Sequence, residues 1–152
     1  MTGYKRMVTC IFCVLITGIC LCSCSKPPVK ADPASLVVSN VEYSIRQTHK
    51  SSFVVDAKGK IKNTGKLAVK NVVVTGYCRS CGLQMLSNKW FTSDVEKTET
   101  QKDTINYLAP GAETEFSFVE VACYMTQENM PPKNLPEKIE IKIESFDTVQ
   151  GS

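Results

Sequence analysis

The sequence has few of the groups that enzymes commonly use in an active site. It contains one histidine and one tryptophan among 152 residues, and no glycine-rich loop of the kind that cradles phosphate groups. The histidine, His49, lies in a polar stretch whose neighbours suggest no Ser-His-Asp or Cys-His arrangement. The formal net charge is only +3, and no basic stripe is interleaved with aromatic residues. These absences argue against histidine-based catalysis and against nucleic-acid binding.

The N-terminus has the pattern of an export signal. Residues 1–6 carry two positive charges, and residues 7–22 follow as an apolar run without charge. This run is shorter than the ~20 residues that a membrane-spanning helix usually needs. It ends at Leu21-Cys22-Ser23-Cys24, with an aliphatic residue three positions before a cysteine and a small residue directly before it. This arrangement resembles the bacterial lipobox, although Cys22 stands where Ala, Ser or Thr is more usual.

The lipobox resemblance implies that residues 1–23 are a cleaved signal peptide and that Cys24 carries a diacylglyceryl group and an N-acyl chain. Two or three acyl chains hold a protein stably at a bilayer. An uncleaved signal anchor and a plain secretory signal are the alternatives. Ser25 follows the cysteine, which resembles sorting to the outer membrane in enteric bacteria. We therefore expect a lipid-anchored protein of the bacterial cell envelope, at the outer membrane rather than the inner one, on its periplasmic or surface side.

The body of the chain alternates apolar and polar residues with the period of β-strands. Residues 24–34 come first and contain three prolines, so they are expected to form an extended tether. Short alternating runs then follow, separated by turn signals, which predicts an all-β antiparallel β-sandwich over residues 35–148 and a tail over residues 149–152. A slip in phase near Ser39-Asn40 predicts a bulge. The runs are Leu36–Ile45, Phe53–Ile61, Val72–Cys78, Thr104–Leu108, Phe116–Cys123 and Ile139–Ile143.

Two turn motifs carry a second resemblance. Asn63-Thr64-Gly65 ends one strand, an aliphatic strand returns through Val69–Val74, and Leu108-Ala109-Pro110-Gly111 introduces a later strand. This order is similar to that of the immunoglobulin-like FxLyD and CARDB-type domains of bacterial and archaeal surface proteins. The resemblance covers about residues 35–147 and implies an immunoglobulin-like fold without a particular activity. Residues 78–82, Cys-Arg-Ser-Cys-Gly, replace the aromatic-Asp turn that the family often has.

Cys78, Cys81 and Cys123 are the cysteines beyond the N-terminal segment. The strands ending at Cys78 and Cys123 are expected to run the same way in opposite sheets. The sequence therefore favours a disulfide from Cys123 to Cys78 or Cys81, and a loop of ~45 residues closed in this way is worth roughly 4 kcal/mol. A local Cys78–Cys81 bridge, with Cys123 buried and reduced, is the first alternative.

A redox dithiol and a zinc site that includes His49 are the remaining readings of these cysteines. No helix clearly follows Cys78-x-x-Cys81, although thioredoxin-type sites need one. Zinc needs four ligands, and His49 belongs to a different turn. Gly82 stands where haem attachment requires histidine. We therefore expect no metal and no cofactor.

Trp90 and Phe91 form an aromatic pair between polar neighbours. They are an exposed contact surface, since aromatic residues anchor interfaces, or they pack over the sandwich, which is more usual for a lone tryptophan. The loops 82–97 and 126–137 are the expected binding surfaces. The sequence thus predicts a non-catalytic, membrane-anchored lipoprotein with an immunoglobulin-like interaction or envelope module and an unidentified protein partner. A thiol–disulfide redox protein using Cys78 and Cys81, and a lipoprotein that binds a small ligand or metal, are the alternatives.

Overall fold

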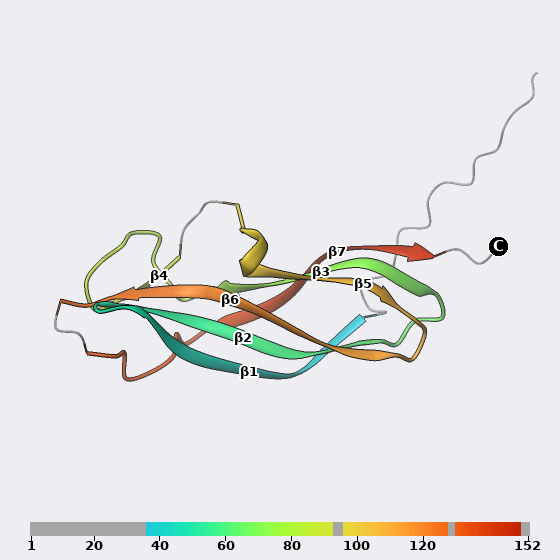
Figure 1. The fold of residues 1–152 in the computed structure, drawn as a ribbon, viewed down its shortest axis with the longest axis horizontal. Helices are drawn as coiled ribbons and strands as arrows, with labels where there is room; N and C mark the ends of the chain where they lie inside the picture. Colours follow the sequence, from blue (N-terminus) through green and yellow to red (C-terminus); the bar gives the residue numbers. More distant parts are fainter. Residues whose placement is uncertain (1–35, 93–95, 128–129, 150–152) are drawn as a thin grey trace, which may run out of the picture.

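The computed structural model describes residues 36–92, 96–127 and 130–149, which fold into two antiparallel sheets (Figure 1). The predicted signal peptide, Cys24 and the predicted tether lie outside these residues. One sheet has the order β1-β2-β6-β4 and the other the order β5-β3-β7. A short 3-10 helix, η2 (Glu99–Gln101), precedes β5. The strands are β1 (Leu36–His49), β2 (Ser52–Asn63), β3 (Ala68–Cys78), β4 (Trp90–Phe91), β5 (Lys102–Leu108), β6 (Glu113–Met125) and β7 (Ile139–Val149).

The hydrophobic core lies between the two sheets, so the predicted all-β sandwich is confirmed. Alternate residues of β2, β3 and β6 face inward, as strand geometry requires. Two glycines in these strands make room for aromatic rings: a Cβ on Gly59 would lie 2.7 Å from Cζ of Phe116, and one on Gly76 would lie 2.9 Å from Cε2 of Phe118. The buried core consists of Leu36, Val55, Ala57, Ile61, Val69, Val72, Val74, Leu108, Phe116, Phe118, Val121 and Ala122.

Two irregularities interrupt the ladder of the first sheet. The predicted bulge in β1 is confirmed, because the register shifts between Ser39 and Glu42 and Asn40 has a φ of 51°. The second lies in β6, where Val119, Glu120 and Val121 stand opposite the single residue Asp56 of β2, and Glu120 has a φ of 61°. The backbone N–H of Glu120 donates to Oδ1 of Asp56 at 3.1 Å, so this carboxylate holds the bulge in place.

Two strands differ from the sequence-based expectations, and one general finding is added. The short strand β4 was not among the expected runs, and its two residues pair with Tyr124 and Cys123 of β6. Strand β7 includes Val149, the first residue of the expected tail. No helix within the described ranges is long and apolar enough to cross a membrane.

One end of the sandwich is organised around Asn63, whose side chain is completely buried. Its Nδ2 donates to the carbonyl oxygens of Leu67 (2.8 Å) and Leu108 (3.1 Å), and its Oδ1 accepts from the N–H of Gly65 (3.0 Å). Its backbone carbonyl also accepts from the N–H of Gly111 at 2.8 Å. The two turn motifs noted in the sequence therefore form one hydrogen-bonded unit, which we call the Asn63 end.

The chain enters and leaves the described domain at this Asn63 end (Figure 1). Leu36, at the start of β1, pairs with Asn63, and Val149, at the end of β7, pairs with Ala68. The loops that follow β3 and precede β7 lie at the opposite end, which we call the Trp90 end. Any segment that precedes Leu36 therefore attaches to the domain at the end away from these loops.

Candidate functional site

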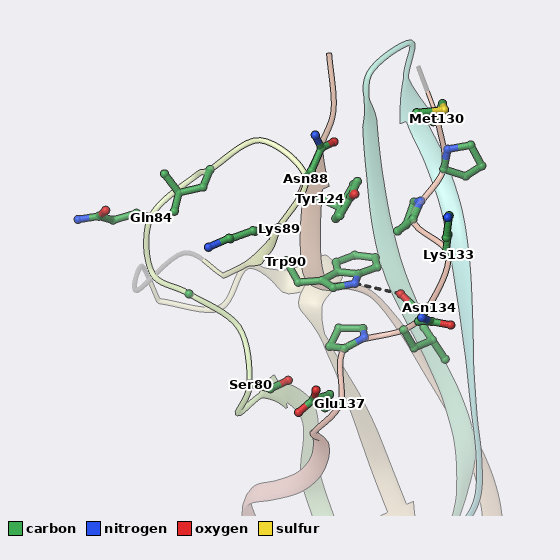
Figure 2. Close-up of a pocket in the computed structure, with 16 residues that line it drawn as sticks. Ser80, Gln84, Asn88, Lys89, Trp90, Tyr124, Met130, Lys133, Asn134 and Glu137 are labelled. Carbon is green, nitrogen blue, oxygen red and sulfur yellow. Dashed lines mark hydrogen bonds between the residues drawn. The ribbon is translucent and has the colours of Figure 1, made fainter. Parts of the chain in front are cut away.

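A groove opens at the Trp90 end, between the loop that follows β3 and the proline-rich loop that precedes β7 (Figure 2). Its cavity volume is about 1030 Å³, at the upper limit of ordinary ligand pockets. We call it the Trp90 groove. It is lined by Ser80, Gly82, Gln84, Leu86, Asn88, Lys89, Trp90, Tyr124, Met130, Pro131, Pro132, Lys133, Asn134, Leu135, Pro136 and Glu137.

Trp90 joins the two walls of the groove. Its indole Nε1 donates a hydrogen bond to the backbone carbonyl of Asn134 at 3.0 Å, which ties one loop to the other (Figure 2). The indole also packs against the core and against the Tyr124 ring, at a centroid distance of 5.2 Å and an interplanar angle of 57°. Trp90 is thus packed over the end of the sandwich, as the sequence favoured, and it also lines the groove. Phe91 does not line the groove.

A disulfide between Cys78 and Cys81 closes the base of the first loop, with a Cα–Cα distance of 5.4 Å. Cys123 has no disulfide partner among the described residues, so the expected bridge from Cys123 to Cys78 or Cys81 is wrong. The local alternative has the correct pairing, although Cys123 is half-buried and not fully buried. Cys123 does stand near the end of β6, but Ala122 beside it faces the core. Because neighbouring residues of a strand point to opposite faces, Cys123 is directed away from the other sheet.

The β6 bulge explains why the sequence gave the wrong partner for Cys123. A bulge of one extra residue would bring Cys123 to the inner face, as the apolar residues Phe116, Phe118, Val119, Val121 and Cys123 of the sequence suggest. The bulge contains two extra residues instead, because Ala57 pairs with Phe118 while Val55 pairs with Ala122. The original phase is therefore restored, and Cys123 lies on the outer face.

The base of the groove is fastened by contacts around the disulfide. The backbone N–H of Arg79 donates to the carbonyl of Lys138 at 2.8 Å, and the N–H of Lys138 donates to Oγ of Ser80 at 3.1 Å. The guanidinium Nε of Arg79 reaches Oε2 of Glu140 at 2.7 Å. The loop also folds back on β4, since the N–H of Gly82 donates to the Trp90 carbonyl at 3.1 Å. The two loops are therefore held together where they leave the sheet.

The outer walls of the groove and its rim are apolar and exposed. Five of the nine exposed large apolar side chains of the described residues belong to these two loops, which marks this end as unlike the rest of the surface. Met85 and Leu83 are the most exposed, at 65% and 64%. The five are Leu83, Met85, Leu86, Met130 and Leu135.

Polar groups without partners accompany these apolar side chains. No acidic group within the described ranges lies within 4.0 Å of the ammonium of Lys89 or Lys133, and Glu137 is the single carboxylate of the lining. The side-chain amides of Gln84, Asn88 and Asn134 likewise make no hydrogen bond to other described residues. The expected binding loops thus meet at one groove, although the amides and lysines in it carried no sequence signal of their own.

The remaining candidate groups, Cys123, Lys97 and His49, lie outside the described lining of the groove. Burial, with the nearby Glu120, raises the pKa of the Cys123 thiol and so disfavours the reactive thiolate. Burial lowers the pKa of Lys97, whose ammonium lies 5.2 Å from the centroid of the Tyr77 ring. His49 is exposed at the end of β1. In the part of the chain that the structure describes, no three His, Cys, Asp or Glu side chains gather into a metal-binding group.

Comparisons with known proteins give no relative. No protein-family model, no curated protein and no solved structure matches this chain. The case for a function therefore depends on the sequence patterns and on the geometry described above.

Proposed function

We propose that this chain is a bacterial envelope lipoprotein, anchored through acyl chains on Cys24, whose sandwich presents the Trp90 groove as a non-catalytic interaction surface. The observation that carries this proposal is the separation of the two ends. The chain enters and leaves at the Asn63 end, whereas the groove and most of the exposed apolar side chains lie at the Trp90 end. A tether that precedes Leu36 leaves the groove free to meet a partner away from the anchoring bilayer.

The strand order supports an immunoglobulin-like sandwich. In constant-type immunoglobulin domains the first, second and fifth strands lie in one sheet, and the third and sixth pair in the other. Here β1, β2 and β6 are consecutive in one sheet, while β3 pairs with β7 in the other. Strand β5, on the far side of β3, takes the place of the additional strand of variable-type domains. Domains of this class commonly carry binding loops at one end of a rigid sandwich.

Thiol–disulfide exchange through Cys78 and Cys81 is the alternative with less support. Bends, rather than a helix, follow the disulfide, so no helix N-terminus is present to lower a thiol pKa. The disulfide also stands where contacts around Ser80 and Arg79 fasten the groove. This position suits a disulfide whose role is to hold the two loops together.

The anchor is tested by mass spectrometry of the N-terminal peptide and by membrane fractionation. We expect the mature chain to begin at Cys24 and to carry diacylglyceryl and N-acyl groups. Cys24→Ala should move the protein from the membrane to the soluble fraction. The matched control is Cys22→Ser, which brings the sequence closer to the usual lipobox and should leave the protein in the membrane. Retention of residues 1–23, or an unmodified thiol at position 24, would contradict the anchor.

A further inference from the structure

We infer that the Trp90 groove binds an extended peptide segment of a partner protein in which apolar and acidic side chains alternate. This inference rests on the proposed interaction function and specifies its ligand. The groove combines exposed apolar walls with amides and lysines that have no partner among the described residues, and each of these three features favours a different part of such a segment. The floor is already organised by the Trp90–Asn134 hydrogen bond and by the disulfide, so little ordering is needed when the ligand binds.

The apolar walls select apolar side chains in the ligand. Leu86 lines the groove from the first loop, and Met130 and Leu135 line it from the second. The flexible thioether of Met130 adapts to apolar side chains of different shape. Pro131, Pro132 and Pro136 restrict the backbone of the second wall, which keeps it from collapsing into the cavity.

The side-chain amides favour a ligand that has a peptide backbone. Each amide offers both donors and an acceptor, which is the combination that an extended backbone presents and needs. Gln84 and Asn88 stand on one wall and Asn134 on the other (Figure 2). None of the three is engaged by another described residue, although Gln84 is directed away from the second loop in Figure 2 and would have to turn toward a strand lying between the walls. A lipid tail offers no such donors and acceptors.

The lysines select acidic groups in the same segment. Among the described lining residues, Lys89 and Lys133 come from opposite walls and outnumber the one carboxylate, Glu137. Two-fold pairing of this surface with a second copy would bring four lysines together with only two carboxylates of the described lining, which disfavours self-association. A flat bilayer would contact the loop tips but not the half-buried Trp90 and Tyr124 at the floor. A narrow peptide reaches all of these groups.

The fluorescence of Trp90 provides a direct measurement, because it is the single tryptophan of the chain. The full chain, with the N-terminus it carries in the cell, is placed in nanodiscs of zwitterionic lipid. It is titrated with three eight-residue peptides in which Leu alternates with Glu, with Lys or with Ser. We expect a saturable change in Trp90 emission with the Glu peptide, and a dissociation constant at least tenfold higher for the Lys peptide.

Charge reversal makes the test specific to the groove. The double variant Lys89→Glu, Lys133→Glu should invert the preference, so that the Lys peptide binds more tightly than the Glu peptide. The matched control is Lys66→Glu, Lys70→Glu, which reverses two exposed lysines near the Asn63 end and should leave both affinities unchanged. Leu86→Ser with Met130→Ser should weaken the Glu peptide about tenfold, and Leu67→Ser, on the turn at the other end, should not.

Several results would overturn the inference. Equal binding of the Glu and Lys peptides, an unchanged preference after charge reversal, or no response to any peptide would each do so. A Trp90 response to phosphatidylglycerol vesicles in place of peptides would assign the groove to lipid. Dimerisation that Leu86→Ser abolishes would assign it to a second copy. None of these results alters the N-terminal mass or the fractionation of Cys24→Ala, so failure of the peptide inference is distinguishable from failure of the anchor.

Discussion

The two ends of this sandwich are formed by the same two sheets but differ in how their loops pack. At the Asn63 end, short turns converge on one buried amide whose donors and acceptor are all satisfied. At the Trp90 end, two longer loops enclose a groove, and their apolar side chains remain exposed. The exposed part of an apolar side chain gains nothing from burial, so the concentration of such side chains at one end is consistent with the binding role proposed for it. The comparison separates the end whose hydrogen bonds stabilise the domain from the end that we propose to bind.

The largest expected effect is at the Asn63 end. Asn63→Ala removes the partner that the buried Leu108 carbonyl finds in the Asn63 amide, and it removes two partly buried hydrogen bonds, to the Leu67 carbonyl and from the N–H of Gly65. At 1–3 kcal/mol for the buried carbonyl and about 0.5 kcal/mol for each of the other two bonds, we expect a loss of about 3 kcal/mol in the free energy of unfolding, measured by urea denaturation. The exposed Asn106→Ala is the control and should change the free energy by less than about 0.5 kcal/mol. A loss below about 1 kcal/mol for Asn63→Ala would show that the side-chain hydrogen bonds of Asn63 do not stabilise this end as described.

Removal of the disulfide has the next largest effect and acts at the Trp90 end. The Cys78–Cys81 bridge closes a very short loop, so Cys78→Ser with Cys81→Ser should cost about 2 kcal/mol, roughly half of what a 45-residue loop would give. Hydrogen exchange should accelerate in residues 79–91 and remain slow around Asn63. Cys123→Ser, which removes an unpaired thiol, is the control and should leave the exchange rates of that loop unchanged. Faster exchange at both ends would remove the distinction between them.

Trp90→Phe tests the link between the two loops with a smaller expected effect. The substitution keeps an aromatic ring but removes the hydrogen bond to the Asn134 carbonyl, which should cost about 1 kcal/mol. Hydrogen exchange in residues 130–137 should then accelerate. Tyr124→Phe retains the ring packing against Trp90 and is expected to leave exchange in this loop as it is. An unchanged loop in Trp90→Phe would mean that the prolines alone hold this wall.

The smallest effect is on chemical reactivity and leaves stability unchanged. Because burial raises the pKa of the Cys123 thiol above its usual value of 9.0, less thiolate is present at neutral pH than for an exposed cysteine. Alkylation of Cys123 by iodoacetamide, followed by peptide mass spectrometry, should be slower at pH 7.5 than that of a cysteine introduced by Ser44→Cys at an exposed position. Its rate should continue to rise above pH 9. Equal rates at pH 7.5 would indicate an accessible, unperturbed thiol.

The sequence predicted the sandwich better than the groove, for physical reasons. Alternation of apolar residues located the six long strands, and the slip at Asn40 located the β1 bulge, because both reflect which face of a strand is buried. The two-residue strand β4 is too short to show a period. The sequence could not give the size of the β6 bulge, and that size decides which way Cys123 points.

The groove was predicted only as a pair of loops. Loops 82–97 and 126–137 were expected to carry contacts, and Trp90 was singled out by being the single tryptophan. A loop has no periodic pattern, so the sequence could not show that the indole of Trp90 donates to the carbonyl of Asn134. That hydrogen bond joins residues far apart in the chain. The disulfide partner of Cys78 was predicted wrongly because the direction of Cys123 depends on the size of the β6 bulge.

The shared position of the first and last described strand ends has a practical consequence for labelling. Since β7 finishes at Val149 beside the point where β1 starts, a fluorescent protein joined after the last residue would emerge on the side remote from Trp90. Such a fusion would report where the molecule is in a living cell without covering the Trp90 groove. An epitope inserted directly before Met130, which lines the groove, could instead serve as a deliberate block.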